Sequence, residues 1–137
     1  MNKLLKTVSF GLCALLVVAC GHSKIATIKQ ITVNVMKVED VKVIVEDNTN
    51  ITAGDGQRFY KITVGLNSTE LSGDPLFNRF SNWSIKILDS DGKEVGPVFG
   101  WIFIDKGKSQ ARIYSNPLAA GGKVKSIVLE GKALSLE

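Results

Sequence analysis

The chain has 137 residues with 17 lysines and arginines, 13 acidic residues and one histidine, which gives a formal charge of +4. Its basic residues are scattered singly, so the sequence gives no support to nucleic-acid binding. The histidine, His22, and both cysteines lie within the first 22 residues. The rest of the chain therefore lacks the side chains of a zinc site or of a Ser-His-Asp or Cys-His catalytic arrangement. We predict no enzyme, no metal site and no cofactor.

The first segment of the chain has the pattern of a signal peptide. Lys3 and Lys6 form a short basic region, and an apolar run of about a dozen residues follows from Val8 to Ala19. A helix that crosses the hydrocarbon core needs about 20 apolar residues, so this run is too short to span a membrane. The run ends in the sequence Val17-Val18-Ala19-Cys20-Gly21.

This ending resembles the lipobox of bacterial lipoproteins, in which an aliphatic residue stands three positions before a cysteine and a small residue directly before it. The resemblance implies that residues 1–19 are removed and that the thiol of Cys20 receives diacylglycerol. The membrane would then be a partner of the protein through this lipid, and two or more acyl chains would hold it stably. An ordinary secretory signal with a chance cysteine, or a buried first helix, is the alternative.

Gly21 bears on the location that this resemblance implies. In Gram-negative lipoproteins an aspartate at this position commonly retains the protein in the inner membrane. Its absence favours the outer membrane, with the protein facing the periplasm or the cell surface. The expected location is therefore the bacterial cell envelope.

Removal of the signal peptide defines the organisation that we expect. It leaves 118 of the 137 residues and, by removing Lys3 and Lys6, lowers the formal charge from +4 to +2. We expect residues 20–24 to be the lipidated cysteine and a short tether, and residues 25–137 to form a single domain. A chain of this size buries about two thirds of its unfolded surface, so it needs no disulfide to hold a core.

From Ile25 onward, apolar residues alternate with polar ones in a period of two, which is typical of half-buried strands. Valine and isoleucine dominate these runs, and segments rich in Asp, Asn and Gly separate them. Residues 70–82 contain Gly73 and Pro75, and we predict an irregular connection there with at most one short helical turn. About seven strands are predicted, near residues 28–38, 41–46, 58–67, 82–89, 97–104, 109–115 and 123–130.

The turn at Asp89-Ser90-Asp91-Gly92 superficially looks like the start of a calcium loop. Such a loop needs a bidentate Glu at its twelfth position, which here is Gly100. Aspartate and glycine tolerate the positive φ angles of a hairpin turn, so a turn explains the segment.

The segment from Pro97 to Ile104 is apolar on both faces when it is read as a strand. One interpretation is a central strand whose aromatic row lies in the core and whose other face lies under residues 77–80. The other is a partly exposed aromatic and aliphatic patch that contacts a protein or a sugar. The candidate contact residues are Phe77, Phe80, Trp83, Phe99 and Trp101.

About seven short strands in little over 100 residues suggest an all-β fold, an antiparallel sandwich of immunoglobulin-like type, with a small barrel as the alternative. Two stretches, FYKITVGLN at residues 59–67 and WSIKILDSDGK at residues 83–93, resemble bacterial lipoproteins that carry a single immunoglobulin-like domain. The resemblance implies this architecture and no functional residues.

The expected function is that of a lipid-anchored envelope protein that acts as a binding or scaffolding module for a protein or a polysaccharide. The alternative is an inhibitor or immunity-type lipoprotein, which neutralises an envelope enzyme or toxin by inserting the connection from Leu71 to Asn82. A carbohydrate-active enzyme would need two carboxylates that face each other in one cleft.

Overall fold

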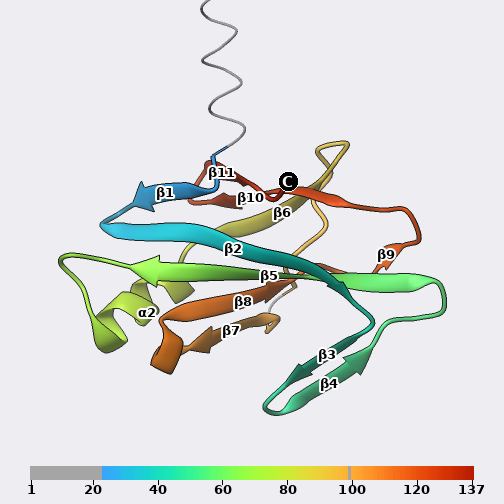
Figure 1. Cartoon of the computed structure of the whole chain (residues 1–137), viewed down its shortest axis with the longest axis horizontal. Coiled ribbons are helices and arrows are strands. Elements are labelled where there is room, and N and C mark those ends of the chain that lie inside the picture. Colours follow the sequence, from blue (N-terminus) through green and yellow to red (C-terminus); the bar gives the residue numbers. More distant parts are fainter. Residues whose placement is uncertain (1–22, 99) are drawn as a thin grey trace, which may run out of the picture.

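The computed structural model describes residues 23–98 and 100–137, so Cys20, most of the tether and Phe99 lie outside the described residues. The described residues form an antiparallel β-sandwich with one α-helix and one short 3-10 helix (Figure 1). Neither sheet closes on itself, which confirms the predicted sandwich and not the small barrel.

The larger sheet is built around two long antiparallel strands of 11 residues each, β2 and β5. A two-residue strand, β9 (Leu118–Ala119), pairs with the beginning of β5. Apart from β9, neighbouring strands of this sheet are hydrogen-bonded in the order β1 (Ile25–Ile28), β2 (Ile31–Val41), β5 (Gln57–Asn67), β8 (Gln110–Tyr114) and β7 (Ile102–Asp105).

The smaller sheet has the order β11 (Lys132–Ser135), β10 (Val124–Leu129) and β6 (Ile85–Asp89). A separate hairpin is formed by β3 (Val43–Glu46) and β4 (Thr49–Thr52). In Figure 1 this hairpin lies at the lower right, on the opposite side of the domain from β1.

The main core lies between the two sheets, and the alternation of the sequence explains it. In part of each long strand, every second residue is an aliphatic side chain that points inward, as the pleat of a strand requires: Ile31, Val33 and Val35 in β2, and Ile62, Val64 and Leu66 in β5. The helix α2 (Gly73–Ser81) adds Leu76, Phe77 and Phe80 to this core. Fully buried members of the main core include Ile31, Val33, Ile62, Val64, Ile113, Ile87, Ile127 and Leu129.

The segment predicted as irregular forms the nine-residue helix α2. Gly73 and Pro75 favour an irregular connection, but both lie in the first turn, where a proline is tolerated because its missing N–H would have no helical partner. Asp74 in the first turn and Arg79 in the last also complement the helix dipole.

The strand predicted at residues 97–104 begins later, at Ile102. Gly100 has a φ of +91° and Gly96 one of +138°, so the chain turns before it can pair with β8. Ile102 and Ile104 pack against the main core, and Trp101 and Phe103 pack elsewhere, on the opposite face of the sheet. The aromatic side chains of this segment therefore pack in a second apolar cluster, and the aliphatic ones pack with the main core, to which Phe77 and Phe80 also belong.

We expect Phe80→Ala to destabilise the domain by about 3–5 kcal/mol, because its side chain is fully buried in the main core. Trp101→Ala should cost clearly less, since Trp101 is only half-buried. Urea unfolding of both variants measures the difference. An equal loss of stability would show that Trp101 belongs to the part of the core on which the fold depends.

Candidate functional site

The β3–β4 hairpin lies across the outer face of the larger sheet and covers a second, smaller group of apolar side chains. We call this group the hairpin cluster: Ile44 and Ala53 from the hairpin segment, and Phe59 and Tyr114 from the sheet, are all buried. Trp101 packs edge-on against Phe59, with ring centroids 5.2 Å apart. The sheet is thus apolar on both faces where the hairpin covers it.

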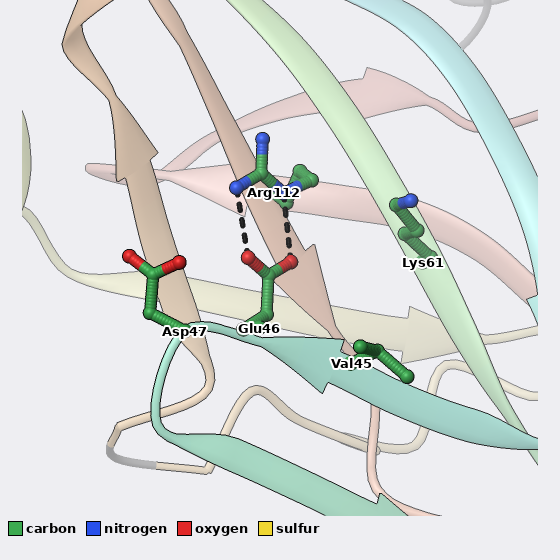
Figure 2. Close-up of a pocket in the computed structure, with 5 residues that line it drawn as sticks. All are labelled: Val45, Glu46, Asp47, Lys61 and Arg112. Carbon is green, nitrogen blue, oxygen red and sulfur yellow. Dashed lines mark hydrogen bonds and ion pairs between the residues drawn. The ribbon is translucent and has the colours of Figure 1, made fainter.

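A carboxylate at the end of β3 attaches the hairpin to the sheet. Glu46 accepts hydrogen bonds from Nε and Nη2 of Arg112, at 2.7 and 2.8 Å, and from the Tyr114 hydroxyl at 2.6 Å. Figure 2 shows the two parallel bonds between Glu46 and Arg112. The Glu46 side chain is only 6% exposed, and Asp105 lies 3.5 Å from Nη1 of Arg112.

The environment of Glu46 decides its protonation state. Burial raises its pKa, but the hydrogen bonds from Arg112 and Tyr114 outweigh burial and hold the pKa below its usual value. Burial, together with the bond to the Glu46 carboxylate, raises the pKa of Tyr114. The hydrogen bonds to Glu46 raise the pKa of Arg112. Glu46 is therefore ionised at neutral pH, whereas the general acid of a glycosidase needs a raised pKa.

An open depression of about 530 Å³ lies where the hairpin meets the sheet, and we call it the hairpin pocket. Val45, Glu46 and Asp47 of the hairpin line it, together with Lys61 of β5 and Arg112 of β8 (Figure 2). Arg112 neutralises Glu46, so Lys61 and Asp47 supply the remaining positive and negative charges. Its lining holds no Ser, Cys or His that could act as a nucleophile or base, and it offers charged groups and the exposed Val45 for binding.

The described part of the chain contains no group of three or more His, Cys, Asp or Glu residues that could hold a metal ion. At the Asp89 turn, Oδ1 of Asp89 accepts hydrogen bonds from the backbone N–H groups of Asp91 and Lys93, both at 2.9 Å. This carboxylate therefore supports a turn, as the sequence predicts.

The predicted contact residues that the structure describes do not form one exposed aromatic patch. Phe77, Phe80 and Trp83 lie together in the main core, at 5%, 0% and 8% exposure. Trp101 lies on the other face of the larger sheet, in the hairpin cluster, and Phe99 is outside the described residues. The expectation that the first three residues border an exposed patch is therefore wrong, because α2 and the sheets cover them.

Sequence reasoning missed the residues of the hairpin pocket. A signal was present, since Arg112 and Tyr114 alternate with the apolar Ala111 and Ile113, which puts both polar side chains on one face of a strand. The position of Glu46, 66 residues earlier in the chain, depends on how the hairpin folds over the sheet. No local pattern indicates that contact.

No protein-family model, curated protein or solved structure matches this chain. Within residues 23–98 and 100–137, no helix combines the length and the apolar character needed to cross a membrane. Function is therefore inferred from the residues and their geometry alone.

We expect Glu46→Gln to lower the free energy of unfolding by about 2–3 kcal/mol at neutral pH, because it removes charged hydrogen bonds at a buried position. The folded-state pKa of Glu46 is lowered, so its contribution is complete above the unfolded value near 4.5 and is lost as the pH falls through the folded value. The difference between wild type and variant should therefore shrink below about pH 4.5.

Urea unfolding at a series of pH values measures this difference. The matched control is Glu94→Gln at an exposed position, which should change stability by less than about 0.5 kcal/mol. A Glu46→Gln effect that is the same at pH 3 and pH 7 would contradict the role given to the ionised carboxylate.

Proposed function

We propose that the protein is a lipid-anchored binding module of the bacterial envelope, attached through Cys20. Gly21, in place of an aspartate, favours the outer membrane as its location. The observation that carries this proposal is how soon the fold begins after that cysteine. Ser23 already accepts a hydrogen bond from the backbone N–H of Ser135 at 2.7 Å, and Lys24 accepts one from Val35 at 2.8 Å. A lipid on Cys20 would hold the whole domain directly at the membrane.

The hairpin pocket is the binding surface that the geometry favours. It lies with the β3–β4 hairpin, on the side of the domain opposite β1, where the chain enters the fold (Figure 1). An anchored domain would thus turn this surface away from its attachment point. Confinement to a membrane raises the effective concentration of such a surface toward other membrane or wall components.

The chemistry of the pocket indicates a polar partner, such as a polypeptide segment or a polysaccharide. Lys61 and Asp47 can pair with charged or hydroxyl groups, and Val45, at 68% exposure, offers an apolar contact beside them. The bidentate bond between Glu46 and Arg112 fixes the hairpin before binding, which reduces the entropy lost when a partner docks.

An inhibitor or immunity-type lipoprotein is the second candidate, and one observation favours it. The hairpin is a braced segment of the kind that can enter the active site of an enzyme. The connection from Leu71 to Asn82 is less suited to this, because its helix buries Leu76, Phe77 and Phe80. An inhibitor of this kind would insert the β3–β4 hairpin into the active site of its target enzyme.

Anchoring is tested by growing cells with an alkyne-labelled fatty acid and comparing the wild type with Cys20→Ala. We expect the wild type to carry the label, and the variant to lose it and to retain its first 19 residues. Processed wild-type protein without label would instead indicate an ordinary secretory signal and would overturn the proposed anchor.

Binding is tested by capturing the lipidated protein from detergent-solubilised envelope and identifying what accompanies it. Lys61→Glu should lower the recovered amount of a specific binding partner at least about tenfold, because a reversed charge in a binding pocket weakens the free energy of binding by more than about 1.4 kcal/mol. Lys108→Glu, an equal change at an exposed residue outside the hairpin pocket, is the matched control. Equal loss with both variants would contradict binding at this pocket.

A further inference from the structure

A second surface of the domain lies where its first and last strands meet. β1 is an outer strand of the larger sheet and β11 an outer strand of the smaller one. The hydrogen bond between Ser135 and Ser23 joins them, and a groove of about 460 Å³ lies beside it. We call half-buried Ser23 and the exposed residues Lys24, Ile25, Lys132 and Ala133 the anchor-side surface. Figure 1 shows β1 and β11 next to each other at the top of the domain.

The distance from Cys20 to this surface is limited by covalent geometry. Ser23 is three positions after Cys20, and an extended chain spans at most about 3.6 Å per residue, so the separation is at most about 11 Å. The headgroup layer on each side of a bilayer is roughly 5–8 Å thick. With lipid on Cys20, Ser23 therefore lies in or directly above the headgroups.

The side chains of the anchor-side surface fit such a location. Ile25 is 55% exposed, so a large aliphatic side chain is available at this surface for insertion between headgroups. Lys24 and Lys132 are exposed as well, and neither forms an ion pair with another described residue. Lysines flanking an apolar side chain are typical of surfaces that contact lipid headgroups.

The acidic residues of this region do not cancel the surface charge. Glu130, on the turn between β10 and β11, is paired with Lys29 at 2.6 Å. Glu137 lies beyond β11, where it lines a different depression together with Glu39 and Asp40. None of these four acidic side chains lines the groove between β1 and β11.

We propose that the anchor-side surface docks on the phospholipid headgroups, with Lys24 and Lys132 bound to lipid phosphates and Ile25 inserted between them. The proposal rests on the proposed lipidation of Cys20, and it gives the anchored domain one preferred orientation. Docking places β1 and β11 against the membrane and leaves the hairpin pocket accessible from above. Each lysine near an anionic surface strengthens the docked state by about fivefold.

The experiment uses single cysteines in the lipidated, purified protein. Cys13 is lost with the signal peptide and the Cys20 thiol is alkylated, so an introduced cysteine is the only free thiol. Ala133→Cys reports on the anchor-side surface, and Asn50→Cys, exposed on β4, is the matched control. Both proteins are added to preformed vesicles of phosphatidylglycerol and phosphatidylcholine in equal parts, and a membrane-impermeant maleimide measures the labelling rates.

We expect the cysteine at position 133 to be labelled at least about fivefold more slowly than the one at position 50 on these vesicles. On phosphatidylcholine alone the protection should weaken. Adding Lys24→Gln and Lys132→Gln should reduce protection by up to about thirtyfold, whereas Lys106→Gln with Lys108→Gln, on the turn between β7 and β8, should leave it unchanged.

Equal labelling at positions 133 and 50 would overturn the docking proposal, and so would equal effects of the two lysine pairs. Mass spectrometry of the amino-terminal peptide separates this failure from failure of the proposed anchor. A peptide without diacylglycerol would refute the anchor, and a lipidated protein that binds vesicles but gives equal labelling would refute docking alone.

Discussion

The position of Tyr114 on the outer face of the larger sheet is the constraint on which the hairpin cluster and the hairpin that covers it depend. Because β8 alternates, the same pleat that buries Ala111 and Ile113 in the main core turns Tyr114 outward. The Tyr114 ring joins Phe59 in an apolar strip that water would otherwise contact. The hairpin removes this strip from water, and its own Ile44 becomes buried in doing so. The hairpin is therefore part of the fold as well as the wall of the pocket.

The pair of Glu46 and Arg112 has a particular energetic role in this arrangement. Replacing a buried ion pair by apolar residues is often neutral for stability, because desolvation offsets the Coulomb attraction, whereas removing one partner is costly. Apolar contacts are also non-directional and would let the hairpin slide over the sheet. Two parallel hydrogen bonds, together with the Tyr114 hydroxyl, define one position. The pair thus selects where the hairpin lies more than it adds net stability.

Most strands could be predicted from the sequence because each carries its own apolar pattern, and β2, β3, β5, β6, β8 and β10 lie where this pattern indicates. The short strands β1 and β11 could not, since their turns place Lys29, Gln30 and Glu130 at positive φ without the usual Asn-Gly signal. The helix was obscured by a proline in its first turn. The hairpin pocket was beyond local patterns altogether, because its charges meet only through tertiary folding.

The outer edge of β6 has a consequence for self-association between copies of this chain. The backbone N–H and C=O groups of Ile87 are both occupied by the segment that follows, through Gly96 and Val95, and Val95 in turn accepts a hydrogen bond from Asn116. Ser135 of β11 likewise donates a backbone hydrogen bond to Ser23, which directly precedes β1. An open strand edge is a template for self-association. Because the segment that follows β6 already occupies these groups of Ile87, a strand of a neighbouring copy cannot pair with β6 at this residue.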